Sequence, residues 1–433
     1  MNRRRMTSWG RVVAGSAALV LALSACGGSD DSDSGDSGSS GESEAPAAAE
    51  GDGTLTIGSL LPQTGSLAFL GPPEFAGVDL AVEEINEAGG VLGEDVVHVR
   101  ADSGDTDSGI APAETDKLLD ADADVIVGAA SSGVSLTVID KILAAGVVMF
   151  SPANTSTAFD EGDYAEPDLY FRTAPSDILQ GAVMANLLLQ DERSNVAILA
   201  RQDAYGETLA QEVTTNLENA GATVADTVFY GERAPSYDSQ VAEIAGAGAD
   251  SLVLIGFEET ASIVPQLIQA GAGPQDLPTY FVDGNTADYS ADSDTPLPPG
   301  TLAGTKGTIP GADAGDDFRN RLLEVDPDLN SFAYAAESYD AVIVSALAAV
   351  AAENDSGEAV GGGIVDVTTG GEKCTTFADC LELVEAGEDI DYDGASGPIE
   401  LGETGSPTAA SIGIYEYQDD NTNEAIEYIE GEI

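Results

Sequence analysis

Basic residues, histidine and cysteine are scarce in this chain of 433 residues. It has 15 Lys and Arg against 77 Asp and Glu, with one His, three Cys and one Trp. The resulting charge of −62 argues against binding to nucleic acid or to anionic lipid through basic patches, because phosphates are repelled over a Debye length of about 10 Å. One His makes a Ser-His-Asp triad or a histidine-rich metal site improbable. We therefore expect no enzyme activity, no metal and no cofactor.

The first 25 residues have the pattern of a secretory signal peptide. Residues 2–5 read NRRR, and Val12–Ala25 is a run of small and apolar residues that is shorter than the roughly 20 needed to span a bilayer. The run ends in Leu23-Ser24-Ala25-Cys26, which resembles the lipobox of bacterial lipoproteins. The resemblance implies cleavage before Cys26 and a diacylglyceryl group on its sulfur. The alternative is ordinary secretion with an incidental Cys.

Residues 26–53 contain mostly Gly, Ser and acidic side chains, so they have little to bury. Such a composition favours a flexible tether that repels itself. Removing residues 1–25, which hold four of the cations and no acid, leaves a charge of −66.

From Thr54 onward the hydrophobic period alternates between two and 3.6, which predicts α/β structure. The expected strands include 55–58, 96–101, 125–128, 147–150, 195–200, 249–256 and 279–282, and the expected helices include 134–145 and 333–352. The motif at 123–128 is echoed at 249–256, which favours two similar lobes. Alternation of this kind predicts mostly parallel sheets with helices on both faces.

Polar residues follow four of the expected strands, where ligands gather in parallel sheets. They are Ala-Ala-Ser-Ser-Gly at 129–133, Ser-Pro-Ala-Asn-Thr-Ser at 151–156, Gln-Asp-Ala-Tyr-Gly at 202–206 and Asp-Gly-Asn at 283–285. Each alone can be explained by helix capping. Together, anion-binding groups in one half and an acid in the other suit a zwitterion held between two lobes.

The chain from Thr54 to its end resembles the branched-chain amino-acid-type substrate-binding proteins of ABC importers. The resemblance is carried by IGSLLPQTGSLAFLGPPEFAGVDLAVEEINEAGGVLG at 57–93, followed in order by VGAASSGVS, FSPANTS, AYGETLA and VDGNTAD. It implies a type I periplasmic-binding-protein fold, with two α/β lobes joined by three crossovers that close on a ligand.

The resemblance also implies a pocket. Ser132 matches the residue that binds the ligand α-carboxylate. Ala153 matches a backbone carbonyl that receives the amino group, and Thr155 matches a hydroxyl and N–H that bind the carboxylate.

The remaining pocket positions complete the implied ligand site. Tyr205 matches the aromatic residue that covers the ligand, and Asp283 matches an acid, typically Glu, that pairs with the α-ammonium. Phe257 stands where the family often has Tyr, so a hydroxyl contact is lost. Phe69 and Leu70 match the loop that lines the side-chain pocket.

The resemblance implies lobe 1 from 54–172 plus 306–406 and lobe 2 from 173–305 plus 407–433. The expected protein is a monomer outside the cytoplasm, anchored to the cell membrane by lipid and working with ABC permease subunits. A receptor for signalling without transport shares every pocket feature, and a secreted lipoprotein enzyme is the third class.

Cys374 and Cys380 are separated by five residues and, outside the cell, are expected to form a disulfide. The alternative, a metal site, lacks further ligands of the right kind.

Three further patterns have more than one interpretation. Ser103, Asp105, Asp107 and Glu114 approach EF-hand spacing, but Ser108 stands where the loop needs Gly, which favours a solvated acidic loop over calcium. His98 alternates with valines, which favours a structural role. Glu258-Glu259 with Asp283 could be a glycosidase acid pair, but no feature sets their separation.

Motifs for nucleotide binding are missing, because no GxGxxG follows a strand and no Gly-Lys-Ser/Thr loop occurs. The acid excess has two readings. It suits a halophilic or marine environment, and lineage-wide compositional drift is the rival explanation.

Overall fold

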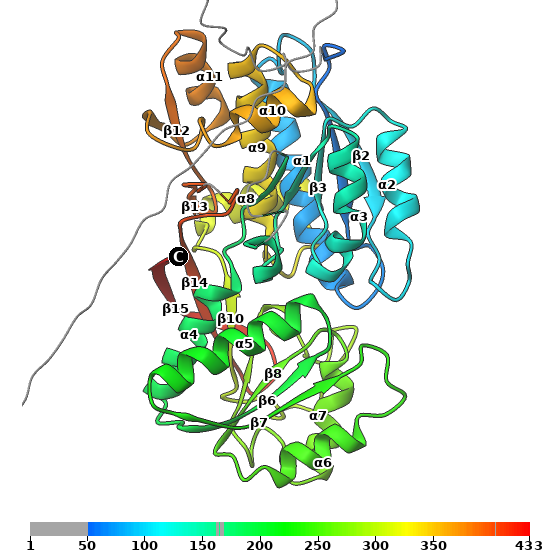
Figure 1. The fold of residues 1–433 in the computed structure, drawn as a ribbon, viewed down its shortest axis with the longest axis vertical. Coiled ribbons are helices and arrows are strands. Elements are labelled where there is room, and N and C mark those ends of the chain that lie inside the picture. The colour runs from blue at the N-terminus through cyan, green and yellow to red at the C-terminus, as the bar shows by residue number, and fades with distance from the viewer. Residues whose placement is uncertain (1–50, 162–163, 165–168, 403) are drawn as a thin grey trace, which may run out of the picture. The chain divides into compact units, whose positions relative to one another are not determined.

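The structure is a computed structural model that describes residues 51–161, 164, 169–402 and 404–433. The expected signal peptide and Cys26 lie outside the described residues, as does most of the expected tether. Within residues 48–433, which form one compact unit, the chain builds two α/β lobes (Figure 1).

Lobe 1 contains a five-stranded sheet with the order β2-β1-β3-β4-β5, in which every pair is parallel. Its central strands are short and wholly buried, as expected for strands covered on both faces. The strands are β1 (Thr56–Leu61), β2 (Val97–Asp102), β3 (Val125–Gly128), β4 (Val148–Ser151) and β5 (Tyr170–Arg172). The lobe's helices are α1 (Gly71–Glu87), α2 (Ala111–Leu119), α3 (Ser132–Ala144), α8 (Gly315–Val325), α9 (Ala335–Ala352), α10 (Gly357–Ile364) and α11 (Phe377–Glu385).

Lobe 2 contains a seven-stranded sheet with the order β15-β14-β10-β9-β8-β6-β7. Five strands are parallel, and β14 and β15 add an antiparallel hairpin at one edge. The strands are β6 (Asn195–Arg201), β7 (Thr223–Tyr230), β8 (Ser251–Ile255), β9 (Thr279–Phe281), β10 (Lys306–Pro310), β14 (Ala409–Tyr417) and β15 (Asn423–Glu432). The helices are α4 (Asp177–Gln190), α5 (Ala204–Asn219), α6 (Asp238–Gly246) and α7 (Thr260–Gln269).

The chain crosses between the lobes three times, after β5, after β10 and before β14. The α/β fold with two lobes and three crossovers that the sequence indicated is therefore confirmed. One boundary differs from the expectation. Residue 306 was expected to begin the return to lobe 1, but β10 pairs with β9 and β14 and so belongs to the sheet of lobe 2. The second crossing lies between Pro310 and Gly315, where α8 begins and packs on α1.

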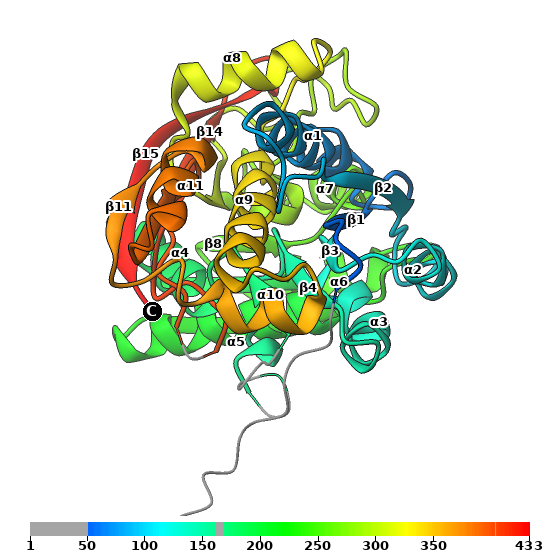
Figure 2. The same ribbon diagram turned by 90° about the horizontal axis from the view of Figure 1, so that it is seen from above.

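Helix α9 forms the centre of lobe 1, where it contacts α1, α10 and α11 (Figure 2). It is apolar on nearly all sides, as the sequence indicated for residues 333–352. Gly77 of α1 permits the close contact, because a Cβ there would lie 2.1 Å from the carbonyl oxygen of Ala335. Among the described residues only α9 is long and apolar enough to cross a membrane, but 83% of it is buried. It is therefore the core helix of a folded lobe.

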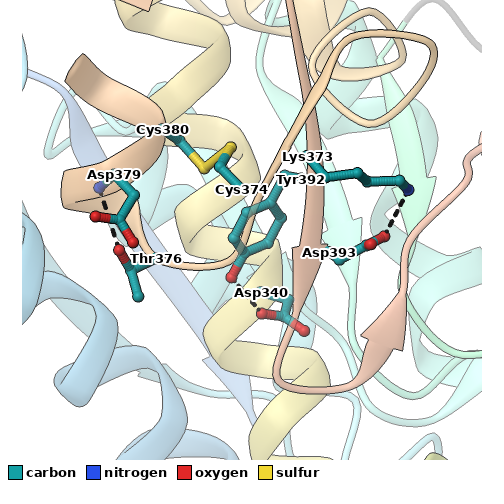
Figure 3. The surroundings of a disulfide bond; sticks show 8 residues. All are labelled: Asp340, Lys373, Cys374, Thr376, Asp379, Cys380, Tyr392 and Asp393. Carbon is teal, nitrogen blue, oxygen red and sulfur yellow. Dashed lines mark hydrogen bonds and ion pairs between the residues drawn. A yellow bond between two sulfur atoms is a disulfide. The ribbon is translucent and has the colours of Figure 1, made fainter. Parts of the chain in front are cut away.

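A disulfide joins Cys374 of β11 (Glu372–Cys374) to Cys380 of α11, as expected from the sequence (Figure 3). Their Cα atoms are 5.3 Å apart. Strand β11 continues into a small sheet with β12 (Ile390–Gly394) and β13 (Gly397–Pro398). Tyr392 of β12 donates a hydrogen bond of 2.7 Å to Asp340 of α9. The disulfide and this bond hold the small sheet against the core of lobe 1.

The last residues of the expected tether contact lobe 1. The N–H of Gly51 donates to Oδ1 of Asn354 at 3.1 Å, and the N–H of Gly53 donates to Oδ2 of Asp355 at 2.8 Å. Both acceptors follow the end of α9. The chain is therefore attached to lobe 1 before β1 begins.

Candidate functional site

A small cavity lies between the lobes, at the carboxyl ends of β3, β4, β6, β8 and β9. Its lining comes from both lobes, and its remaining volume is about 10 Å³, close to the space that one water needs. The two lobes are thus nearly closed on each other. The lining residues are Leu67, Leu70, Ala130, Ser131, Ser132, Ala153, Tyr205, Phe257, Asp283, Gly284 and Tyr334.

Lobe 1 contributes the start of α3. Ser131 is the N-cap, and its hydroxyl accepts a hydrogen bond from the N–H of Val134 at 3.5 Å. Ser132 follows as the first helical residue, and its Oγ accepts the N–H of Ser156 at 3.4 Å. The first N–H groups of a helix lack partners within it and carry partial positive charge. This wall of the cavity is suited to a carboxylate.

Lobe 2 contributes the carboxylate of Asp283, which begins a single 3₁₀ turn directly after β9 and Val282. Oδ1 accepts from the Tyr205 hydroxyl at 2.6 Å and from Nε2 of Gln180 at 2.9 Å. Oδ2 accepts from the hydroxyl of Tyr334 at 2.8 Å. Tyr334 lies directly before α9 of lobe 1, so this last bond joins the two lobes across the cavity.

The acid is costly to bury. Burial raises the pKa of Asp283 above its usual range, although the donors Tyr205, Gln180 and Tyr334 work in the opposite direction. Burial and the carboxylate of Asp283 also raise the pKa of the Tyr205 and Tyr334 hydroxyls, so both remain donors. A cation at this position would relieve the cost of the buried negative charge.

Two stacked rings form the lobe 2 wall beside Asp283. The rings of Tyr205 and Phe257 have centroids 5.4 Å apart and planes inclined by 22°. Gly284 makes room for Phe257, since a Cβ at Gly284 would lie 2.5 Å from that ring. The guanidinium of Arg201 also packs on Phe257, with its Cζ 3.5 Å from the ring centroid. Phe257 is therefore held between a ring and a cation.

Arg201 is itself buried among acids. It pairs with Asp203 at 2.6 Å, with Glu259 at 3.0 Å and with Glu232 at 3.3 Å. Burial alone would lower the pKa of Arg201, but Asp203 and Glu259 raise it above its usual range. Glu259 also accepts from the hydroxyl of Tyr230 at 2.9 Å. This carboxylate is engaged in an ion pair and a hydrogen bond, which gives Glu259 a structural role.

Most of the residues singled out in the sequence meet at the cavity. Of the eight ligand-binding residues expected, six line it: Leu70, Ser132, Ala153, Tyr205, Phe257 and Asp283. Phe69 instead is partly buried against the apolar cluster that includes Leu67 and Leu70. Thr155 is buried behind the cavity wall, where its carbonyl accepts from the N–H of Asp177 at 2.7 Å.

Two residues that hold Asp283 were missed. Gln180 lies inside α4, and Tyr334 lies about fifty residues beyond Asp283 in the chain. Neither directly follows a strand, so the rule that located the other positions could not find them. Their only sequence signal is a polar side chain in or next to an apolar helical run.

Two other patterns also have structural explanations. Asp105 and Asp107 of the acidic loop pair with Arg233 of lobe 2. His98 lies between Asp79 and Ser59, with ring nitrogens 2.9 Å from Oδ1 of Asp79 and 2.8 Å from Oγ of Ser59. Burial lowers the pKa of His98 to about 4. It is a partnered structural residue, as expected.

Comparison with known proteins extends the interpretation. The family model described as "Periplasmic binding protein" matches residues 54–422. The chain is 29% identical over 360 residues to the chemotactic signal transduction system substrate-binding protein BasB of Halobacterium salinarum, covering 80% of this chain and 83% of that protein. It is 31% identical over 229 residues to Leu/Ile/Val-binding protein homolog 3 of Brucella melitensis, covering 50% of this chain and 58% of that protein.

Solved structures share the fold. The branched-chain amino acid transporter substrate-binding protein LivJ of Streptococcus pneumoniae, in complex with isoleucine, aligns with a TM-score of 0.68 at 19% identity, covering 88% of this chain and all of that one. A solute-binding protein of an ABC transporter from R. palustris, in complex with 4-hydroxybenzoate, aligns with a TM-score of 0.71 at 16% identity, covering 88% and 98%. At these identities the likeness shows the fold alone.

Proposed function

Because the chain belongs to the periplasmic binding protein family, whose members are extracytoplasmic solute receptors, and has the type I fold of that family, we propose that it captures an amino acid or a related amide for an ABC importer. The observation that supports this proposal is the opposed chemistry of the cavity walls. An anion-binding helix start faces a buried carboxylate across a space lined mainly by apolar side chains. A solute with a carboxylate at one end and an ammonium at the other suits both walls.

The carboxylate of the solute binds at the start of α3. Ser132 supplies a hydroxyl there, and the unpaired N–H groups of the first turn supply further donors. Thr155 does not line the cavity, so its hydroxyl and N–H are not part of this proposed carboxylate site. Lobe 1 thus binds the ligand first, because these groups need no residue of lobe 2.

The ammonium binds between Asp283 and the carbonyl of Ala153. The donors Tyr205 and Gln180 orient the carboxylate of Asp283, while Oδ2 has one protein donor, Tyr334. An ammonium shares or replaces that single bond. The pairing neutralises a buried charge, so it is retained only when the lobes have closed and excluded water.

Closure then covers the side chain of the solute. Tyr205 and Phe257 approach from lobe 2, and Leu70 lines the pocket from lobe 1; Phe69 supports Leu70 from behind. The mechanism is a hinge motion about the three crossings that shifts the population toward the state recognised by the permease. It includes no chemical step, in keeping with a binding protein and not an enzyme.

The proposal is tested by a thermal-shift screen followed by calorimetry. Amino acids, their amides, ureas, benzoate and 4-hydroxybenzoate are the probes. A specific ligand at one hundred times its dissociation constant stabilises the protein by about 2.7 kcal/mol, and we expect this from an aliphatic amino acid. Stabilisation by benzoate without any response to amino acids would contradict the proposal, because benzoate offers no cation to Asp283.

A second candidate function is sensing without transport. It is favoured by the likeness to BasB, which is named for chemotactic signal transduction and which this chain matches over 80% of its length. The same pocket serves both functions. Genes for a permease and an ATPase beside this one favour uptake, and a neighbouring gene for a membrane transducer favours sensing.

We also propose that the chain acts as a monomer and is anchored to the outer face of the cell membrane through a lipid on Cys26. The support is the lipobox-like Leu23-Ser24-Ala25-Cys26 after an apolar run. In a host with lipoprotein processing, Cys26→Ser should release the protein from the membrane fraction. A substituted protein that stays in that fraction would contradict the anchor.

A further inference from the structure

Two loops meet across the edge of the cleft that is farthest from the crossings. One follows β2, at one edge of the lobe 1 sheet, and the other follows β7, at one edge of the lobe 2 sheet. The chain crosses between lobes at the opposite side, after β5 and beside β10 and β14 (Figure 1). Contacts between these two loops therefore lie as far from the crossings as the sheets allow, where they oppose separation of the lobes most effectively.

The contacts are charge-assisted. Nη2 of Arg233 donates to Asp105 Oδ1 at 3.0 Å and Oδ2 at 2.9 Å, and Nε lies 2.8 Å from Oδ2 of Asp107. Thr106, between the two acids, donates to the carboxylate of Glu232. The carboxylate of Asp105 is oriented toward Arg233 by a second contact, since its Oδ1 also accepts the N–H of Ser108 at 2.8 Å. An Arg fork that binds two carboxylates is directional as well as attractive.

We propose that Asp105, Asp107 and Arg233 form an electrostatic latch that holds the lobes closed and so raises ligand affinity without touching the ligand. Both lobes are rich in acid, so approach of the lobes is opposed by repulsion that the latch offsets at the rim. The proposal rests on the proposed function in one respect, namely that the cleft opens and closes around a solute. Arg233 thus acts by holding the two lobes together and does not contact the ligand.

The latch also connects to the ligand wall. Glu232, which accepts from Thr106 of lobe 1, lies 3.3 Å from Nη2 of Arg201. Arg201 in turn packs on Phe257, which stacks on Tyr205. The rim contact of Thr106 with Glu232 is therefore linked through Arg201 to the two rings of the ligand wall.

The test compares Arg233→Gln with Lys373→Gln in the full chain. Lys373 is a matched control, because it is also a surface cation paired with two acids, Asp391 and Asp393, and all three lie in the small sheet of lobe 1. Small-angle scattering without ligand measures opening of the lobes. We expect a larger radius of gyration for Arg233→Gln than for wild type, and no change for Lys373→Gln. With isoleucine as probe, apparent affinity should fall about two- to fivefold.

A charge swap separates the latch from a folding defect. The double variant Asp105→Arg with Arg233→Asp should recover the wild-type scattering curve, whereas each single change opens the lobes. Equal scattering curves for Arg233→Gln, Lys373→Gln and wild type would overturn the latch. The scattering result does not depend on isoleucine, so a failure of isoleucine to bind any variant counts against the proposed function and leaves the latch to be decided by scattering.

Discussion

Asp283 places a carboxylate in the wall of the cavity. It is buried and accepts three hydrogen bonds from side chains of both lobes. Replacing it by Ala should abolish amino-acid binding, because loss of one partner of a buried ion pair costs about 3–5 kcal/mol. Calorimetry measures the affinity, and circular dichroism shows whether the fold is kept. Tyr334→Phe is the control, since it removes a donor to Asp283 and keeps the charge.

An unchanged affinity in Asp283→Ala would contradict the assignment of the ammonium site. Tyr334→Phe should retain binding, because Oδ2 then becomes more available to the ligand.

Glu74 is a second buried acid. Neither of its carboxyl oxygens has a hydrogen-bond partner among the described residues. Burial, and then the carboxylate of Glu337, raise the pKa of Glu74 well above its usual range. The raised pKa contributes stability that is complete below the unfolded pKa of about 4.3 and is lost as pH rises through the folded value.

We therefore expect Glu74→Gln to match wild type in free energy of unfolding at pH 3.5, below the unfolded pKa, and to exceed it at pH 8.5. Urea unfolding at both pH values measures the difference. Glu83→Gln, on the exposed face of the same helix, should change neither value. A Glu74→Gln variant that loses more stability at pH 8.5 than at pH 3.5 would contradict this prediction and show that the acid is needed in its charged form.

At the scale of elements, the contact of α1 with α9 depends on a missing side chain. A Cβ at Gly77 would lie 2.1 Å from a backbone oxygen of α9, so the helices must separate to accommodate it. We expect Gly77→Ala to destabilise the protein by about 1–3 kcal/mol. Gly362→Ala in α10, where a Cβ meets nothing within 4 Å, should be neutral or stabilising by about 0.5–1 kcal/mol. Thermal or urea unfolding of both variants checks the pair, and equal effects would contradict the close contact.

The elements that sequence could predict are those defined by local patterns. Strand β3 is a four-residue apolar run closed by Gly128, and its predicted bounds are the observed ones. The residues of β10 were assigned to lobe 1 with the rest of 306–406 but belong to the sheet of lobe 2, because membership in a sheet depends on partners distant in the chain. The hairpin of β14 and β15 was not predicted for the same reason.

The residues of the candidate site likewise fall into those that local patterns predict and those that they do not. Ser132, Ala153 and Asp283 directly follow strands, and the parallel sheets bring them together. Gln180 and Tyr334 reach Asp283 from a helix and from a helix start, and only the tertiary packing reveals them. The latch loop was recognised as acidic, but its cation, Arg233, is 128 residues away from Asp105.

At the scale of the whole molecule, the excess of acid is the dominant property. A charge of −62 produces self-repulsion that salt screens within a Debye length of about 3 Å at 1 M. We expect the melting temperature to rise between low and molar sodium chloride. A melting temperature that stays flat over this range would remove the case for salt adaptation and favour compositional drift.

The point where the chain enters the folded body has a mechanical consequence. Gly51 and Gly53 are fastened to Asn354 and Asp355 at the end of the core helix of lobe 1. Under the proposed anchor on Cys26, a pull transmitted through Gly51 would therefore act on lobe 1, and lobe 2 would be the part that moves when the cleft closes.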